Sequence, residues 1–396
     1  MPDRELDVVL FGATGFTGGL TADYLAGAVP DGCRWALAGR NQAKLAAVRD
    51  RLAAEHPEHP ELAQIPLLHA DATDPASLAD VAGRARVVIS TVGPYVEHGE
   101  PLVAACAEAG TDYVDLTGEP EFVDTVYVKH HRRAVETGAR IVHACGFDSV
   151  PHDLGVLFTV QQLPEGVPLR VRGMVRSNAT LSGGTFASAL GAFARTRQMR
   201  QAHAARRKVE PRVEGRRVRT VAKRPHHDAE AGYWLVPLPT IDPFVVRRSA
   251  AALERYGPDF SYSHYAAAKR LPSVVGGIGL VGGLAAAAQV PPLRRFLLSR
   301  LPQGQGPSEE RRARSYFSVR FIGEGGGRTV HTEVRGGDPG YTETAKMLAE
   351  SALCLAFDDN PDTAGQVTTA VAMGQNLLDR LVKAGLQFTV QRTSEA

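Results

Sequence analysis

A glycine-rich run at residues 12–18, GATGFTG, constrains the fold of this 396-residue chain more than any other feature. It lies between LDVVLFGA, an apolar run that predicts a strand, and GGLTADYLAGAV, which predicts a helix. In such a unit, glycines let the backbone approach a dinucleotide pyrophosphate, which the N–H groups at the start of the helix bind. The alternative is a turn that needs glycine only for packing. The residues predicted to contact the dinucleotide are Gly12, Thr14, Gly15, Phe16, Thr17 and Gly18.

Alternation of apolar runs and helical patterns continues over residues 6–150 and contains six short strand candidates. This order is typical of an α/β protein with a Rossmann-type, doubly wound parallel sheet. After residue 153 the pattern becomes α+β, with a strand at 168–177, a hairpin over 315–337 and helices at 342–357 and 367–385. We predict an NADP-binding Rossmann domain over residues 1–153 and a second α+β substrate or oligomerisation domain over 154–340.

The end of the second predicted strand indicates which dinucleotide is bound. Sites for NAD usually place Asp or Glu there to bind the ribose 2′-hydroxyl. This chain instead has Gly39, Arg40 and Asn41, followed by Lys44 one helical turn later. The planar guanidinium of Arg40 suits a 2′-phosphate, so we predict NADPH as cofactor. The alternative is that Arg40 is a solvated cation at a helix start.

Three further loops complete the predicted cofactor site, because the carboxyl ends of parallel strands meet at one sheet edge. The loop after the third strand is expected to meet adenine, and those after the fourth and sixth strands the nicotinamide. The residues concerned are Asp71, Ala72, Thr91, Val92, Gly93, Pro94, Cys145, Gly146 and Phe147. Asp71 has a second interpretation as a helix N-cap. Cys145 is expected to be a buried small side chain, since no fixed base stands beside it.

The four cysteines are far apart in the sequence and form no C-x-x-C pair. This pattern predicts neither a disulfide scaffold nor a metal site, and it is typical of a reducing compartment. No apolar segment precedes the first strand, so no signal peptide is expected. We therefore expect a cytoplasmic protein.

A basic segment at residues 195–224 carries twelve Lys or Arg and two Asp or Glu, a net charge of +10 in a chain of net charge +2. One interpretation is a solvated surface segment. The other is a docking surface for an anionic partner such as an acidic carrier protein, a phosphopantetheine tail or lipid head groups. Nucleic acid is not predicted, because the segment lacks interleaved aromatic residues.

An apolar segment at residues 271–293 contains no charged residue and is flanked by Lys269–Arg270 and Arg294–Arg295. Its length would span a bilayer, but it contains several Gly and Pro residues. The first interpretation is a helical hairpin that is buried or lies on the protein surface. Peripheral membrane contact, helped by the flanking cations, and a true membrane span are the alternatives.

Taken together, GATGFTG, AGRN, TVGPYVEHGEPLVAACAEAGTDYVDLTGE and CGFDSVPHDLG resemble the saccharopine dehydrogenase-like oxidoreductase family, and in particular its trans-acting enoyl reductase branch. The resemblance is dense over residues 7–157 and resumes in GDPGYTETAKMLAESAL and AMGQNLLDRLVKAG. It implies a bilobal protein whose C-terminal part, about residues 341–396, packs back on the first domain. It also implies NADP-linked reduction and lipid or polyketide biosynthesis.

The chain departs from this family pattern at two places. His152 stands where relatives usually have a small residue, often Ser, and Thr368-Thr369-Ala370 where Thr-Pro-Ala is more usual. Both departures bear on which substrate is used.

We therefore expect an NADPH-dependent oxidoreductase that reduces the enoyl group of a carrier-bound polyketide or lipid-like substrate in trans. Tyr95 and Asp148 are the predicted catalytic residues, because their loops lie at the nicotinamide edge. In the alternative, Tyr95 only packs on the cofactor, Asp148 only caps a helix, and water supplies the proton. The rival functions are reduction of an imine or carbonyl on a small metabolite, and a non-catalytic NADP-binding, lipid-associated protein. A homodimer is left open.

Overall fold

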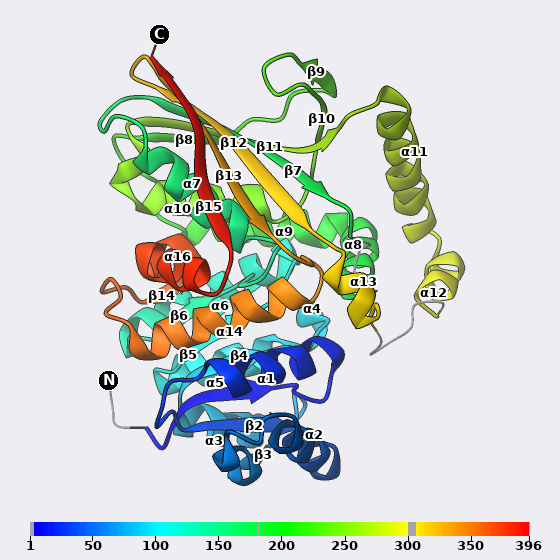
Figure 1. Ribbon diagram of the computed structural model, residues 1–396, viewed down its shortest axis with the longest axis vertical. Coiled ribbons are helices and arrows are strands. Elements are labelled where there is room, and N and C mark those ends of the chain that lie inside the picture. The colour runs from blue at the N-terminus through cyan, green and yellow to red at the C-terminus, as the bar shows by residue number, and fades with distance from the viewer. Residues whose placement is uncertain (1–3, 180–182, 300–305, 396) are drawn as a thin grey trace.

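The computed structural model describes residues 4–179, 183–299 and 306–395, whose elements form two stacked lobes (Figure 1). The lower lobe is built on sheet A, which has seven parallel strands. Their spatial order is β14 (Gly365–Val367), β6 (Arg140–Val142), β5 (Asp112–Asp115), β4 (Ala85–Ser90), β1 (Leu6–Phe11), β2 (Trp35–Gly39) and β3 (Leu67–His69). The six predicted strands are β1 to β6, and β14 is a seventh that the sequence did not predict.

Helices cover both faces of sheet A, which confirms the doubly wound α/β fold. The helices of this lobe are α1 (Phe16–Ala28), α2 (Gln42–Glu55), the 3₁₀ turn η1 (Pro60–Gln64), α3 (Pro75–Arg84), α4 (Tyr95–His98), α5 (Glu100–Ala109), α6 (Pro120–Thr137), α14 (Thr342–Phe357), α15 (Thr369–Ala372) and α16 (Gly374–Lys383), of which α16 packs on α14. The strand β1 is buried along its whole length. That burial is why its sequence is almost continuously apolar rather than alternating.

The upper lobe is built on sheet B, a mixed sheet of eight strands. Its main path is β15 (Gln387–Glu395), β13 (Arg328–Gly336), β12 (Phe317–Gly325), β7 (Leu169–Ser177), β11 (Asp259–Ala268), β10 (Tyr233–Pro237) and β9 (His226–Asp228), and β8 (Arg217–Thr220) pairs with β11. The accompanying helices are α8 (Gly183–Ala194), α9 (Thr196–Val209), α10 (Asp242–Ala252), η2 (Glu254–Tyr256), α11 (Leu271–Ala288), α12 (Pro291–Ser299) and α13 (Glu309–Ala313). The predicted strand at 168–177 and the hairpin over 315–337 correspond to β7 and β12–β13.

One helix, α7 (Val150–Gln161), connects the lobes. It begins just beyond β6 and packs against β12 and β13 of sheet B. A single apolar core runs from Leu10 on β1 through Leu154 on α7 to Phe321 on β12. The loop between β6 and α7 is therefore held between the two sheets.

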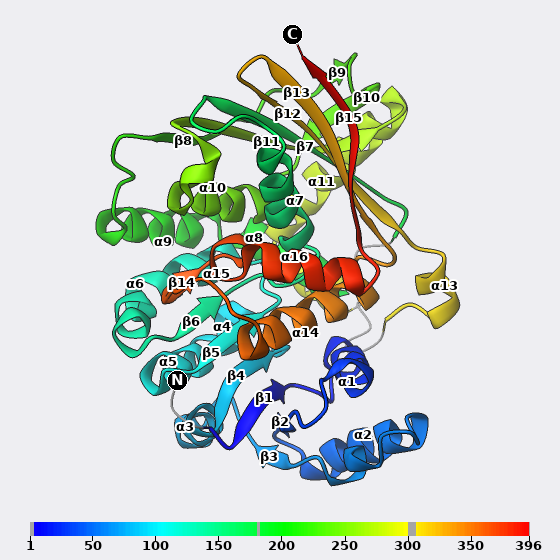
Figure 2. The same cartoon turned by 60° about the vertical axis from the view of Figure 1, so that its left-hand side comes forward.

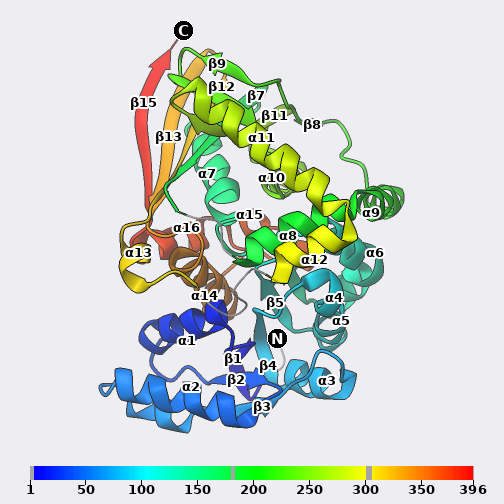
Figure 3. The same ribbon diagram turned by 90° about the vertical axis from the view of Figure 1, so that its right-hand side faces the viewer.

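The C-terminal part of the chain contributes to both lobes (Figure 2). The helix α14 packs on α1, β4 and β5, and β14 pairs with β6 at the edge of sheet A. The last strand, β15, instead pairs with β13 in sheet B. Beside the upper lobe, α11 and α12 form an arm that contacts α8, β10 and β11 through α11 (Figure 3).

Candidate functional site

The glycine-rich loop joins β1 to α1, as predicted, and leaves no room for a side chain at two positions. The φ angle of Gly12 is +98°, and a Cβ there would lie 2.6 Å from Thr91 Oγ1. A Cβ on Gly18 would lie only 2.1 Å from the Gly12 carbonyl oxygen. At Gly15, the N-cap of α1, no side chain binds the first helical N–H groups. These groups are therefore available to a phosphate.

Residues from the distant segment 306–341 cover the start of α1. The Phe16 ring packs edge-on against Tyr341, with ring centroids 4.9 Å apart, and the Arg312 guanidinium carbon lies 5.6 Å from the Phe16 centroid. Arg312 Nη1 donates to the Pro307 carbonyl, while its Nε is buried without a hydrogen-bond partner among the described residues. Arg312 thus places a cation beside the glycine-rich loop. No local sequence signal predicts this role of Arg312, because it stands in an ordinary charged helix.

The residues predicted to select the dinucleotide follow β2 at the same edge of sheet A. Gly39 is the last residue of β2 and is buried, whereas Arg40 is exposed. Asn41 Oδ1 accepts the Lys44 N–H at 2.9 Å and caps α2. This cap fixes the turn that carries Arg40 while leaving its guanidinium free to meet a ligand.

After β3, the Asp71 carboxylate bonds within its own turn. It accepts the Thr73 N–H at 2.9 Å and the Thr73 hydroxyl at 2.8 Å, and these hydrogen bonds lower the pKa of Asp71. The N-cap of α3 is Asp74, which accepts the Ala76 N–H. The interpretation of Asp71 as a helix cap is therefore wrong, and its contact with adenine, like that of Ala72, stays a prediction.

The loop after β4 is tied to the loops on either side. Thr91 Oγ1 donates to the Phe11 carbonyl at 3.2 Å, and Val92 lies beside Gly12. The Gly93–Pro94 peptide bond is cis. Glu119, after β5, accepts the Val96 N–H at 2.8 Å at the start of α4. The structure therefore brings Thr91 and Val92 against the glycine-rich loop, and the cofactor contacts of Gly93 and Pro94 stay predictions.

Tyr95 points into the core of the lower lobe. Its hydroxyl donates to the Ser90 carbonyl at 2.9 Å and accepts the Leu116 N–H at 3.2 Å, and burial raises its pKa well above the usual value. The hydroxyl proton of Tyr95 is therefore already donated to the Ser90 carbonyl. The role of Tyr95 as a proton donor stays a prediction, and this bonding does not favour it.

The loop after β6 is fixed by backbone hydrogen bonds. The Cys145 N–H donates to the Asp115 carbonyl at 2.7 Å, and the Phe147 N–H donates to Thr344 Oγ1 on α14 at 3.0 Å. A Cβ on Gly146 would lie 2.8 Å from Leu116. Burial raises the pKa of the Cys145 thiol, so it stays protonated and is a poor nucleophile.

Asp148 ends this loop, immediately before the N-cap of α7, and is partly buried. Its Oδ2 lies 3.2 Å from the place that a Cβ on Gly118 would occupy, so the carboxyl group faces the loop after β5. No hydrogen bond or ion pair holds it within the described part of the chain. Burial raises the pKa of Asp148 to about 6, with Asp242 adding to the rise and His152 opposing it. A protonated fraction is therefore present near neutral pH, unlike at an ordinary Asp.

Beside Asp148 the structure assembles a buried cluster that the sequence analysis did not find. His152 Nδ1 on α7 lies 2.7 Å from Asp242 Oδ1 on α10, and His264 Nε2 on β11 lies 3.6 Å from Asp242 Oδ2. His264 Nδ1 also bonds to the Tyr262 hydroxyl at 2.9 Å. His152 stands in a motif that the sequence singled out, but its partners lie on distant elements and carry no local signal.

These three side chains offer atoms that can bind a metal, all within 4.8 Å of one another. The 2.7 Å separation of His152 Nδ1 and Asp242 Oδ1 is however shorter than the roughly 3.3 Å expected between two ligands of a tetrahedral zinc ion. Neither of these two atoms makes an aligned hydrogen bond among the described residues.

The basic segment at 195–224 is partly neutralised by the protein itself. Four of its twelve cations bind internal acceptors: Arg195 binds Glu121, Arg206 binds Glu210 and Asp124, Arg216 binds backbone carbonyls, and Arg219 binds Asp259. The other eight are exposed, namely Arg197, Arg200, Arg207, Lys208, Arg212, Arg217, Lys223 and Arg224. The free positive surface is therefore smaller than the net charge of +10 suggests.

Most of the apolar segment is the single helix α11 on the protein surface, and α12 begins at its end with Pro291. By length and composition α11 could cross a membrane, with a mean hydropathy of 1.7 over 18 residues, of which only 11% are buried. Its exposed apolar side chains are Leu271, Val275, Ile278, Leu280 and Val281, and Val290, Leu293 and Phe296 continue this surface onto α12. The segment therefore lies on the surface, but the predicted hairpin within it is wrong, because residues 271–288 form one helix and only residues 291–293 belong to α12.

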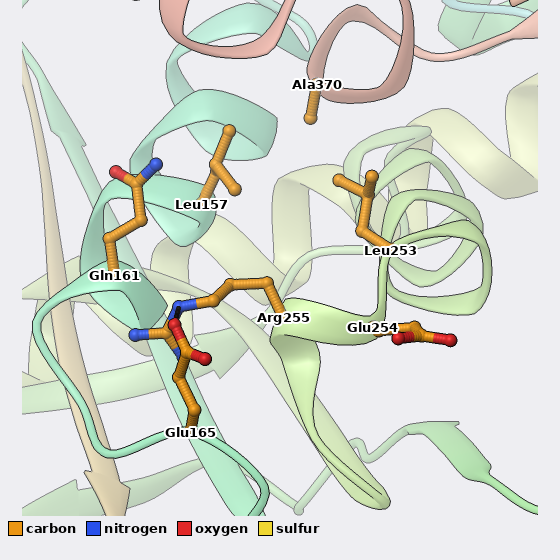
Figure 4. Close-up of a pocket in the computed structure, with 7 residues that line it drawn as sticks. All are labelled: Leu157, Gln161, Glu165, Leu253, Glu254, Arg255 and Ala370. Atoms are coloured by element: carbon orange, nitrogen blue, oxygen red, sulfur yellow. Dashed lines mark ion pairs between the residues drawn. The ribbon is translucent and has the colours of Figure 1, made fainter. Parts of the chain in front are cut away.

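A cleft of about 510 Å³ lies at the opposite end of α7 from His152 (Figure 4). It is lined by Leu157, Gln161, Glu165, Leu253, Glu254, Arg255 and Ala370. Arg255 Nε pairs with Glu165 Oε1 across it at 3.4 Å. None of the predicted site residues lines this cleft, so it is separate from the candidate site.

Comparison with known proteins agrees with this architecture. Residues 8–142 match the saccharopine dehydrogenase NADP binding domain. The chain is 40% identical to a putative trans-acting enoyl reductase of Mycobacterium tuberculosis and 37% identical to a trans-acting enoyl reductase of Mycobacterium ulcerans, with 98% of each chain covered. Apo saccharopine dehydrogenase (L-Glu forming) from Saccharomyces cerevisiae has the same fold, with a TM-score of 0.55 at 14% identity, covering 98% of this chain and 100% of that one.

Proposed function

Since the chain belongs to the saccharopine dehydrogenase-like oxidoreductase family, with relatives named trans-acting enoyl reductases, we propose that this NADP-dependent oxidoreductase reduces an enoyl group carried by a separate protein. The substrate class is a carrier-bound polyketide or lipid-like enoyl thioester. The observation that carries the proposal is the similarity over both lobes, 98% of each chain, since it includes the residues around the cofactor and those of the second lobe.

We expect NADPH to be held by residues of both lobes. The glycine-rich loop and the open N-terminus of α1 bind the pyrophosphate, and Arg40 binds the 2′-phosphate. Arg312 covers the phosphates from the other lobe. The loops after β4 and β6 bind the nicotinamide half. When bound there, NADPH supplies the hydride for the β-carbon of the enoyl group.

The proton for the α-carbon comes from Asp148. It is the one predicted catalytic group whose hydrogen-bonding capacity is unused among the described residues, and its pKa, raised to about 6, keeps part of it protonated. Tyr95 positions the loops after β4 and β5 through its two hydrogen bonds.

The test is NADPH consumption with an enoyl thioester, together with titration of both cofactors. Arg40→Ala should weaken NADPH binding roughly tenfold or more and leave NADH binding unchanged, because a charge-assisted bond is worth ~1.5–3 kcal/mol. Arg49→Ala, on the helix α2 that begins just after Arg40, is the matched control and should change neither. Equal NADPH affinity in Arg40→Ala and wild type would show that Arg40 does not bind the 2′-phosphate.

The exposed cations of the basic segment favour an acidic carrier protein as the partner that presents the thioester. Arg207 and Lys208 are exposed neighbours on α9 and are free of internal ion pairs in the described chain. Their replacement by Glu should raise KM for an acyl-carrier-bound substrate and leave KM for the same acyl group on a small thiol unchanged. Equal KM changes for both substrates would contradict carrier docking here.

The exposed apolar surface of α11 and α12 favours peripheral contact with a lipid surface, since cations flank it at both ends. Val275 is 63% exposed and Leu280 is 65% exposed. Replacing both with Asp should abolish co-sedimentation with anionic liposomes at low salt. Val382→Asp, at a valine on α16 that is 46% exposed, is the control. If wild type does not sediment, the lipid contact is wrong and the enoyl reductase proposal stands.

The rival functions give different results in the same assays. A reductase of small imines or carbonyls would consume NADPH with those compounds and not with enoyl thioesters. A non-catalytic protein would bind NADPH without turnover on either panel. Neither alternative is favoured by relatives that cover both lobes.

A further inference from the structure

The loops that follow β5 and β6 meet at one buried side chain, that of Asp115, the last residue of β5. Asp115 is fully buried. Its Oδ1 accepts the Thr117 N–H in the loop after β5 and the Ala144 N–H in the loop after β6, both at 3.0 Å. Its backbone carbonyl accepts the Cys145 N–H at 2.7 Å. Asp115 therefore fixes the first turn of both loops.

The other carboxyl oxygen of Asp115 is bound by His143, the residue directly after β6. His143 Nδ1 lies 2.7 Å from Asp115 Oδ2. The imidazole packs edge-on against the rings of Tyr113 and Phe122, with centroids 5.8 and 5.3 Å away. Its Nε2 is buried and has no hydrogen-bond partner among the described residues. The hydrogen bond of this imidazole is therefore with Asp115, and it fixes the orientation of the carboxyl group.

The residue that Asp115 binds in the loop after β6, Ala144, has an unfavourable backbone conformation. Its φ angle is +60°, and within the described part of the chain every other residue with a positive φ is glycine. L-residues avoid this region because the Cβ comes too close to the backbone carbonyl oxygen. Such a conformation persists where surrounding contacts impose it. Here the hydrogen bond from the Ala144 N–H to Asp115 does so, and the turn leads the chain from β6 into residues 145–147, which are predicted to bind the cofactor.

A chain of hydrogen bonds also joins Asp115 to the loop after β4. Beside the Thr117 N–H that Asp115 binds, Thr117 Oγ1 accepts the Glu119 N–H at 3.2 Å. The Glu119 carboxylate in turn accepts the Tyr95 and Val96 N–H groups at 3.3 and 2.8 Å. The two loops proposed to bind the nicotinamide half of NADPH, after β4 and β6, are therefore both connected to Asp115.

We propose that Asp115 is a positioning residue for the nicotinamide half of NADPH, with His143 orienting its carboxyl group. This inference rests on the proposed function, which places the nicotinamide against the loops after β4 and β6. The adenosine half is instead assigned to the glycine-rich loop and Arg40, and no hydrogen bond joins Asp115 to either within the described structure. Loss of the Asp115 side chain therefore weakens binding of the nicotinamide half and leaves binding of the adenosine half unchanged.

The test is calorimetric titration with two ligands, NADPH and adenosine 2′,5′-bisphosphate, which has the 2′-phosphate but no nicotinamide. Asp115→Ala should weaken NADPH binding roughly tenfold, as expected when ligand hydrogen bonds are misaligned, and leave the affinity for the bisphosphate unchanged. Asp115→Asn should bind NADPH like wild type, because its Oδ1 still accepts both N–H groups and its amide donates to His143 Nδ1. Equal losses for the two ligands, or wild-type NADPH affinity in a folded Asp115→Ala, would overturn the proposal.

The matched control is Asp112→Asn, at the amino end of the same strand. Asp112 is also buried, and its Oδ1 accepts the Arg140 N–H of β6 at 2.8 Å, as Asp115 accepts that of Ala144 at the other end. This change should lower the free energy of unfolding and leave both affinities unchanged. A loss of NADPH affinity alone in Asp112→Asn would show that the effect is not specific to Asp115 and would overturn the proposal.

Two further variants keep the test decisive. In an Ala144→Gly background, Asp115→Ala should weaken NADPH binding less than it does alone, because glycine adopts a positive φ without being held there. Equal losses in the two backgrounds would overturn the step through Ala144. If Asp115→Ala does not fold, His143→Phe keeps a packed ring and removes Nδ1. It should weaken NADPH binding roughly threefold or more with the bisphosphate unaffected, and wild-type NADPH affinity would overturn the proposal.

The titrations also separate this inference from the proposed function. If wild type reduces no enoyl thioester, the proposed function fails, and the two titrations still decide the role of Asp115. Gly146→Val displaces the loop after β6 directly, because a Cβ there would lie 2.8 Å from Leu116 and 3.0 Å from Thr344. NADPH binding that is weakened in Gly146→Val and not in Asp115→Ala would overturn the role of Asp115. Unchanged NADPH binding in both would overturn the placement of the nicotinamide and this inference with it.

Discussion

Replacement of Tyr95 by Phe separates a structural from a chemical role for this residue. The change deletes one oxygen and leaves the Ser90 carbonyl, which is buried, and the Leu116 N–H, which is partly buried, without their partner. An unsatisfied buried group costs roughly 1–3 kcal/mol, and the partly buried N–H adds less because water can reach it. We therefore expect the free energy of unfolding to fall by ~2–4 kcal/mol, measured by urea denaturation followed by circular dichroism.

The matched control is Tyr316→Phe, since Tyr316 is 39% exposed and its hydroxyl has no such buried partners. That change should alter the free energy of unfolding by less than about 0.5 kcal/mol. The kcat of Tyr95→Phe, measured well below its unfolding midpoint, should stay within tenfold of wild type. A proton donor would instead contribute ~10²–10⁴-fold. If Tyr95→Phe is as stable as the wild type but its kcat is a hundredfold lower, the structural role is refuted and Tyr95 is the proton donor.

Three further changes test other parts of the structure. Gly18→Ala should abolish NADPH binding in a calorimetric titration, because the new Cβ would lie 2.1 Å from the Gly12 carbonyl oxygen; wild-type affinity would show that α1 can move away. Asp148→Asn should stabilise the protein by up to ~3 kcal/mol at pH 7. The pKa of Asp148 is about 6 in the folded state, which is above its value in the unfolded chain, so the stability of the wild type falls as pH rises from about 4 to about 6. If the stability of the variant falls in the same way over this pH range, the raised pKa does not belong to Asp148. Asp124→Ala should destabilise the protein by ~3–5 kcal/mol in urea, because Arg248 would lose its counter-ion while Arg206 would keep only Glu210, and a loss below about 1 kcal/mol would contradict it.

The sequence was sufficient for the first lobe because its signals are local. Each strand from β1 to β6 is a short apolar run followed by a helix, and the glycine-rich loop has a spacing that few other structures require. The strand β14 has only three residues, Gly365–Val367, too few to show a period. The strand β15 lies at the edge of sheet B and is mostly exposed, so its polar sequence resembles a tail.

The candidate site was predictable where it lies on one loop and unpredictable where it is assembled from several elements. Asp148 and His152 stand in one motif, but their surroundings depend on Asp242 and His264, which come from α10 and β11. Burial, which raises the pKa of Asp148 to about 6, is likewise a property of the folded lobes. For the same reason, the net charge of the basic segment overstates its exposed positive charge, because a charge count does not show that Arg206 is buried against Asp124.

The path of the C-terminal chain has a consequence for how the protein is made. Sheet A acquires its edge strand β14 and its covering helix α14 only after residues 342–367 have left the ribosome, although β6 ends at Val142. Until then, the edge of β6 and the apolar surface beneath α14 are open to water and to other nascent chains. The Rossmann domain is therefore finished last although it is synthesised first. A gene shortened after residue 153 should yield an aggregating fragment instead of an autonomous nucleotide-binding module.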